Sequence, residues 1–450
     1  MSGPLCRASR RCDPAPARRR TLAAMNERNS RGARLAAITR VFSSLAVPNY
    51  RLYFAGQVIS LSGTWMQGVA QAWLVLDLTG SGTALGVVSA FQFLPMLLLG
   101  PLGGVVADRF DNRRILLVTQ VVSGGLAATL GLLVASGAIE VWMVYALAGC
   151  LGLVLVVDNP TRQTFVHEMV GADQLTNAVS LNSVVVNVAR VIGPSFAGAL
   201  IVTVGLAPCF LINAASYGAV VAALLAMNPN RLVRGAAASR RRGQLREGFR
   251  YVRSTPDVLI PLAMMAIVGT LAYEFQVTLP LLARFTFGGD AGTYATMSAL
   301  MGAGAIAGGL ATAAGGRRRA TSLASTAMVF GAIQLGASVA PTLIAVYVVL
   351  VLVGAASIRF LALGNATLQL ASDPAMRGRV MALWAVAFLG STPIGGPIVG
   401  WVGEHAGPRL ALGMGGVATL VSGIVAHRTL TRVEGRPGPM EPIPPPKPIS

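Results

Sequence analysis

The sequence predicts an all-α, polytopic membrane protein of about twelve transmembrane helices in two pseudo-symmetric halves. Hydrophobic residues make up 54% of its 450 residues and charged residues only 12%, whereas soluble domains usually carry about 25% charged residues. The uncharged stretches are about twenty residues long, which is the length that a helix needs to cross a bilayer. The basic residues collect in alternate gaps between these stretches.

Twelve apolar segments are long enough to cross the membrane, with bounds defined to within a few residues. In chain order they are Leu52–Leu76, Thr83–Ala107, Ile115–Ser136, Val141–Phe165, Leu175–Val204, Cys209–Met227, Leu259–Ala283, Tyr294–Ala314, Thr321–Ala340, Thr342–Leu370, Val380–Val402 and Pro408–Ala426.

The longest hydrophilic interval between spans divides the chain into two halves of six. The expected units are a basic disordered arm (1–48), the first half (49–227), a cytoplasmic central loop (228–257), the second half (258–428) and a Pro-rich tail (429–450). The halves resemble each other, because a glycine–proline pair recurs in spans five and eleven, as Gly193-Pro194 and Gly396-Pro397. Repeated halves are a known transporter plan, with the binding site between them.

Charge predicts the orientation in a cell (inner) membrane. With both termini in the cytoplasm, the cytoplasmic segments hold 32 of the 36 basic residues and the external loops hold two, as the positive-inside rule requires. The net charge of +19 therefore does not indicate nucleic-acid binding. The four cysteines and three histidines are scattered, which predicts no metal site. We expect no cofactor, and no nucleotide-binding loop is present.

Polar residues form a stripe along span one, at Gln57, Ser60, Thr64, Gln67 and Gln71. At about 100° per residue they lie within roughly 80° of one another. The stripe is interpreted as the lining of a water-filled substrate cavity. The alternative, that it hydrogen-bonds to neighbouring helices, stays open.

Charged residues lie inside four spans. Glu274 in span seven is the candidate proton-coupling carboxylate, because an acid deep in a span can exchange protons near neutral pH. The candidate substrate contacts are Asp158, Asn187, Arg190 and Arg359. We expect the two arginines to pair with Glu274 or with an anionic substrate. The alternative is a static ion pair that only joins helices.

The loop between spans two and three contains Gly104, Asp108, Arg109 and Arg113. This pattern resembles the cytoplasmic signature of the major facilitator superfamily, although Asp111 replaces a glycine. Asp373 begins the segment before span eleven and is expected to cap that helix. The resemblance implies a cytoplasmic gate in which Asp108 meets the start of span eleven. Gly193, Pro194, Gly396 and Pro397 would pack or bend their helices.

Further segments narrow the resemblance. Asn49 to Gln57, Gly63 to Gln67, Asn159 to Gln163 and Arg190 to Pro194 are similar to the branch that holds the enterobactin exporter and macrolide efflux proteins. This resemblance implies a monomeric, proton-driven exporter of a drug, siderophore or secondary metabolite that works by alternating access, and not an enzyme. Two alternatives remain: a membrane-embedded lipid-modifying enzyme, and a non-transporting scaffold or sensor.

Overall fold

The computed structural model describes residues 42–233, 244–313 and 320–434, and these residues form helices without strands. The expected N-terminal arm lies almost wholly outside the described residues, as do most of the C-terminal tail and the basic segment 317–319. The α-helices are α2 (Pro48–Thr79), α3 (Gly82–Arg109), α4 (Asn112–Ala135), α5 (Val141–Val204), α6 (Ala207–Ala226), α7 (Gln244–Ser254), α8 (Pro256–Ala272), α9 (Phe275–Leu281), α10 (Ala291–Ala313), α11 (Ala320–Val339), α12 (Leu343–Ala371), α13 (Arg377–Leu389), α14 (Thr392–His405) and α15 (Pro408–Glu434).

The count of about twelve spans is confirmed. Ten segments of the described residues are long and apolar enough to cross a membrane. One of them, α5, contains predicted spans four and five, which meet at Gly171, a glycine in the left-handed region with φ 71°. The remaining span is α2, whose polar stripe lowers its hydropathy although its 32 residues can easily cross a bilayer.

Two predicted spans of the second half are broken, contrary to the continuous helices that we expected. Span seven is divided into α8 and α9, with Glu274 at the break. Span eleven is divided into α13 and α14, and Pro393 lies in the first turn of α14. Proline has no backbone N–H to donate, so a new helix starts there more readily than an old one continues.

Helix α7 and the start of α13 were not anticipated. Helix α7 lies within the segment predicted as the central loop and packs on α13, where Glu247 and Arg379 form an ion pair at 2.8 Å. Asp373 does not cap α13, which begins at Arg377. The carbonyl of Asp373 instead accepts from the N–H groups of Met376 and Arg377, closing a turn ahead of the helix.

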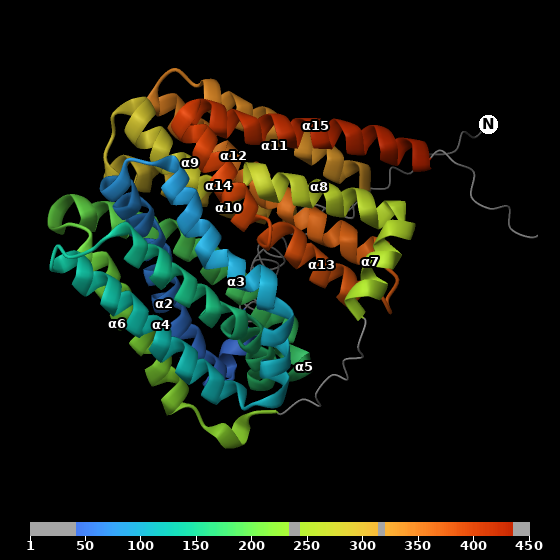
Figure 1. Ribbon diagram of the computed structural model, residues 1–450. Helices are drawn as coiled ribbons and strands as arrows, with labels where there is room; N and C mark the ends of the chain where they lie inside the picture. The colour runs from blue at the N-terminus through green and yellow to red at the C-terminus, as the bar shows by residue number, and fades with distance from the viewer. Residues whose placement is uncertain (1–41, 234–243, 314–319, 435–450) are drawn as a thin grey trace, which may run out of the picture.

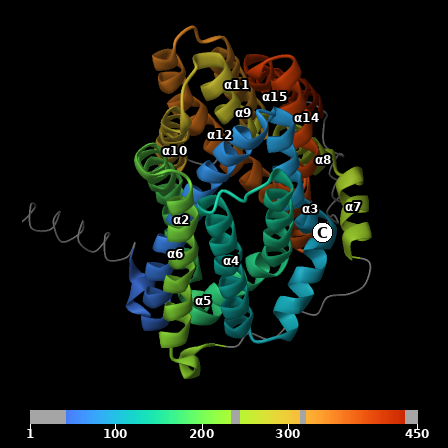
Figure 2. The same cartoon turned by 60° about the vertical axis from the view of Figure 1, so that its left-hand side comes forward.

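Helices α2 to α6 form the N-terminal half, and α8 to α15 form the C-terminal half (Figure 1). The two bundles meet along α3–α14 and α5–α10 and spread apart toward the end of the molecule that carries α7. A view turned by 60° shows α7 standing outside the bundle (Figure 2). We name the two extremities the α7 end and the distal end.

The distal end is where the halves are joined. A Cβ atom on Gly86 would collide with the backbone of Gly396, so only glycine permits this approach of α3 to α14. Glu404 accepts hydrogen bonds from the Ser81 hydroxyl at 2.6 Å and the Thr83 N–H at 2.9 Å. The halves therefore form a wedge that is closed distally and opens toward the α7 end.

Candidate functional site

The polar stripe of α2 is largely buried against neighbouring helices. The Gln67 side-chain oxygen accepts a hydrogen bond of 2.6 Å from Asn213 of α6. Gln57, Ser60 and Gln71 are also buried, whereas Thr64 is exposed. At Gln67 the structure shows the alternative interpretation, a hydrogen bond to a neighbouring helix. The cavity-lining role of the stripe stays a prediction.

Arg190 lies where the two halves meet. Its guanidinium carbon is 4.9 Å from the centroid of the Trp65 ring, a cation–π contact between α5 and α2. Its Nε atom is buried without a hydrogen-bond partner. Within the described ranges, no acidic side chain forms an ion pair with Arg190, so its charge is available to a ligand.

A cavity of about 40 Å³ adjoins Arg190 and is lined by residues of both halves. Trp65 and Pro194 come from the N-terminal half, and Gln276 from α9 of the C-terminal half. Tyr294 and Ser298 come from α10. The cavity lies between α2 and α5 of one half and α9 and α10 of the other, where the opening of the wedge ends, and we call this place the apex. Transporters built from repeated halves bind their substrates between the halves.

The glycine–proline pairs lie at helix contacts in both halves. A Cβ atom on Gly193 would lie 2.5 Å from the Cβ of Trp65, so this glycine lets α5 approach α2. Gly396 and Pro397 make the matching approach of α14 to α3 at Gly86. The first pair therefore packs two helices within the N-terminal half, and the second pair packs helices of the two halves against each other.

Asn187 lies one turn before Arg190 on α5. Its amide nitrogen donates to the Ser183 carbonyl at 2.8 Å, and its side-chain oxygen is buried without a partner in the described residues. This unsatisfied oxygen leaves Asn187 as a candidate hydrogen-bond acceptor one turn from Arg190, although Asn187 does not line the cavity.

Asp158 is fully engaged inside the N-terminal half. It is 2% exposed and accepts hydrogen bonds from Thr119 at 2.7 Å and Gln120 at 2.9 Å. Arg162 forms an ion pair with it at 2.7 Å. This is the geometry of the static ion pair that the sequence left as an alternative, although its role in transport is untested.

Glu274 lies at the crossing of the two broken helices. It is 5% exposed, and its Oε1 atom has no hydrogen-bond partner among the described residues. A Cβ atom on Gly395 would lie 3.1 Å from that oxygen. The carboxylate interacts with the side chain of Thr392, in the first turn of α14. A helix N-terminus favours a negative charge, so α14 offsets part of the cost of burying deprotonated Glu274.

The structure does not bring Arg359 to this site. Its side chain lines a separate groove, with His427 of α15 at the same groove. Within the described residues, Glu274 forms no ion pair with Arg190 or Arg359, so the expected pairing is not observed.

The expected gate residues lie at the α7 end of α3 and α4. Gly104 is buried, and Asp108 and Arg109 occupy the last turn of α3. Arg113 donates to the Leu224 carbonyl at 2.8 Å at the end of α6. Asp373, in the other half, donates its backbone N–H to the Tyr251 hydroxyl of α7 at 3.0 Å. The gating roles remain untested.

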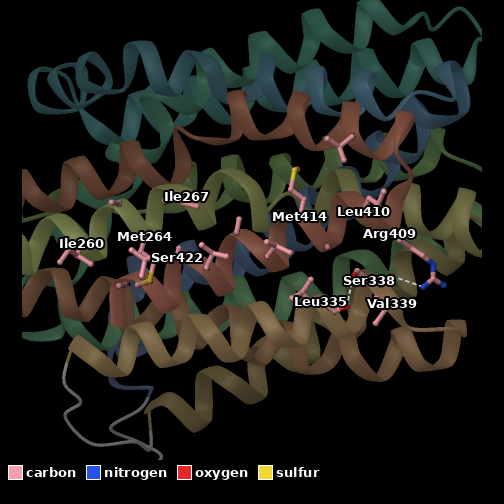
Figure 3. Close-up of a pocket in the computed structure, with 18 of the residues that line it drawn as sticks. Ile260, Met264, Ile267, Leu335, Ser338, Val339, Arg409, Leu410, Met414 and Ser422 are labelled. Carbon is pink, nitrogen blue, oxygen red and sulfur yellow. Dashed lines mark hydrogen bonds between the residues drawn. The ribbon is translucent and has the colours of Figure 1, made fainter. Parts of the chain in front are cut away.

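A long apolar groove lies outside this site. It measures about 1320 Å³ and runs along α8, α11 and α15 (Figure 3). Its lining is aliphatic, as at Ile260, Met264 and Leu410, and its one arginine, Arg409, donates to the Ser338 carbonyl at 3.0 Å. Such a surface suits contact with lipid chains.

Sequence reasoning missed Trp65, Gln276 and Thr392 as site residues. Trp65 lies inside a segment that carried the family resemblance, and Gln276 is two residues from Glu274. The break between α8 and α9 lies beside Glu274, so the pattern of a continuous helix does not describe how Glu274 and Gln276 lie. No local signal links Thr392 to Glu274.

Solved structures share this fold. A bacterial homologue of the human lysosomal transporter Spinster, inward-facing and unoccupied, aligns with a TM-score of 0.67 at 14% identity over 86% of this chain and 98% of its own. The nucleoside transporter NupG aligns with a TM-score of 0.67 at 12% identity over 85% and 99%. These likenesses show that the two-bundle fold of this chain is one found in membrane transporters.

The sequence comparison specifies the family. Residues 39–446 match the family described as transmembrane secretion effector, and the chain belongs to this family of the major facilitator superfamily. The predicted superfamily is thereby confirmed. The chain is similar to the staphyloferrin A transporter of Staphylococcus aureus, at 29% identity over 37% of this chain and 42% of that protein. It is also similar to the multidrug efflux pump Tap of Mycolicibacterium fortuitum, at 27% identity over 81% and 91%.

Proposed function

We propose that the protein is a proton-driven exporter that works as a monomer in the inner membrane, with both termini and the α7 end in the cytoplasm. The observation that carries this proposal is Glu274, a buried carboxylate with an unpartnered oxygen at the crossing of two broken helices. The efflux relatives support the direction, since Tap is a multidrug efflux pump and macrolide efflux protein A of Streptococcus pyogenes is 24% identical over 34% of this chain.

The substrate is a small molecule that carries a negative or electron-rich group. Arg190 is always protonated, and its charge inside the membrane requires a ligand, water or an aromatic face. The Trp65 ring supplies the aromatic face but no negative charge to balance the guanidinium. We infer that the anionic part of the substrate contacts Arg190 while its apolar part occupies the apex between α2, α5, α9 and α10.

Coupling operates through the break in α8–α9. When Glu274 binds a proton it loses the charge that the N-terminus of α14 favours. The contact between α9 and α14 then weakens, and α14 also carries Gly396 and Glu404, which join the two halves at the distal end. Release of the proton to the cytoplasm restores the contact and the distally closed wedge.

The test is Glu274→Gln, which keeps the shape of the side chain and cannot release a proton. A panel of macrolides, tetracyclines and carboxylate siderophores, applied to a deletion strain, first identifies an exported compound. In proteoliposomes we expect the variant to lose pH-gradient-driven transport of that compound and to keep exchange without a gradient. Glu140→Gln, an exposed acid before α5, is the matched control. Gradient-driven transport at the wild-type rate in Glu274→Gln would refute the coupling role.

A further inference from the structure

The groove that contains Arg359 is distinct from the apex of the wedge. It measures about 510 Å³ and lies between α10, α11 and α12, with His427 of α15 at its edge. Helix α10 packs tightly on α12, because a Cβ atom on Gly308 would collide with the backbone of Ala355. This contact forms the wall on the side of the N-terminal half. Helix α11 lies at the far side of the C-terminal half (Figure 1).

The polar groups of the groove share one depth in the membrane. Arg359 lies about 24 Å along α12 from Leu343, and His427 about 28 Å along α15 from Pro408, at ~1.5 Å per residue. Helix α11 runs in the opposite direction, and Ser322 and Thr326 occupy its first turns. Because the hydrocarbon layer is about 30 Å thick, all four groups lie near its boundary at the α7 end.

The deeper part of the groove is apolar. Val329 of α11 and Leu352 of α12 line it, and each is more than half exposed. Val329 lies about 14 Å from the start of α11, and Leu352 about 14 Å from the opposite end of α12. The groove thus has a cationic mouth at the boundary and an aliphatic floor in the hydrocarbon layer, which matches the shape and polarity of one phospholipid.

Among the described residues, the charge at the mouth has no acidic counterpart. No acidic residue lines the groove in the described part of the chain, and within that part Arg359 forms neither a hydrogen bond nor an ion pair. The Nδ1 atom of His427 is buried without a partner. A guanidinium near the hydrocarbon layer needs water or an anion, and phosphate is an anion that Arg binds well.

We propose that this groove binds one anionic phospholipid of the leaflet at the α7 end, with the phosphate at Arg359 and His427 and an acyl chain along Val329 and Leu352. Basic pockets between transmembrane helices recognise such head groups. The groove in Figure 3 differs because its one arginine, Arg409, already donates a hydrogen bond to the Ser338 carbonyl at 3.0 Å, and most of its lining is aliphatic.

The experiment measures lipid retention by native mass spectrometry of the full-length protein, titrated with dioleoylphosphatidylglycerol. We expect one tightly retained molecule, about tenfold weaker binding in Arg359→Gln because a charge-assisted contact is lost, and an unchanged titration in Arg428→Gln. Arg428 is the matched control, because it is exposed beside His427 and does not line the groove. Equal retention by wild type and Arg359→Gln overturns the proposal.

Three further arms identify the ligand. Val329→Trp fills the floor without changing charge, and we expect it to weaken retention of phosphatidylglycerol as well. Dioleoylphosphatidylcholine should bind more weakly than phosphatidylglycerol, and equal binding refutes the preference for an anionic head group. Glycerol phosphate should not compete. Competition by glycerol phosphate, with Val329→Trp unaffected, would show a free-phosphate site and overturn the lipid assignment.

Discussion

Two buried acids, Asp158 in the N-terminal half and Glu274 in the C-terminal half, look alike in sequence and differ in structure. Both are at most 5% exposed and both lie inside apolar spans. Asp158 has an arginine and two hydrogen-bond donors around it. Glu274 has a threonine side chain and an unpartnered oxygen. Burial alone therefore does not distinguish an acid that holds helices together from one that can titrate.

The helices around these acids differ in the same way. Asp158 is held between α4 and the unbroken first part of α5. Glu274 lies at a break, and α14 begins at a second break beside it. A continuous helix satisfies its own backbone, whereas a broken one leaves backbone groups for side chains and ligands. We infer that the N-terminal half is the rigid partner and the C-terminal half carries the switch.

The largest expected effect is on stability, from Asp158→Asn. Breaking a fully buried pair costs about 3–5 kcal/mol, and we expect about 2 kcal/mol because the Arg162 side chain is 25% exposed. The unfolding midpoint in detergent should fall well below that of the wild type. Glu274→Gln is the comparison and should unfold near the wild-type midpoint. An equal loss of stability in the two variants would remove the distinction between the acids.

The second prediction compares two arginines. Arg190 pairs with no acid among the described residues, so Arg190→Lys should leave the unfolding midpoint unchanged. We expect it to lower transport about tenfold, because Lys lacks the delocalised guanidinium that lies over Trp65 and its multiple donors. Arg190→Ala should abolish transport. Arg162→Lys should instead destabilise the protein through the weakened pair with Asp158. Wild-type transport by Arg190→Ala would refute the substrate contact.

The smallest effect concerns a third acid, Asp108, at the α7 end. We propose that it contacts the N-terminal end of α13 when the wedge closes there, which is a charge–dipole contact of about 1 kcal/mol. Asp108→Asn should shift spin-label distances between the loop at Phe110 and the turn at Asp373 toward longer values. Substrate affinity of the inward-open form should not change. An unaltered distance distribution would leave Asp108 with a topological role alone.

Arg359 and Gln67 show where sequence reasoning reached its limit. Hydropathy placed both inside spans, and the structure confirms that they lie in membrane-length helices. Periodicity cannot say which neighbour each side chain faces. Gln67 turned out to bond to Asn213 of α6, and Arg359 lines a groove on α12 away from the apex. The direction in which each side chain points depends on contacts with helices that are distant in the chain.

The sequence by itself determined the membrane class, the number of spans and the superfamily, because these depend on composition, on segment length and on motifs read within one loop. The tertiary structure decided which charges are paired, where spans seven and eleven break, and which residues meet at the apex. Glu274 approaches Thr392 only because glycines at Gly269 and Gly395 let two broken helices cross closely. Such a contact joins segments more than a hundred residues apart, so no local pattern encodes it.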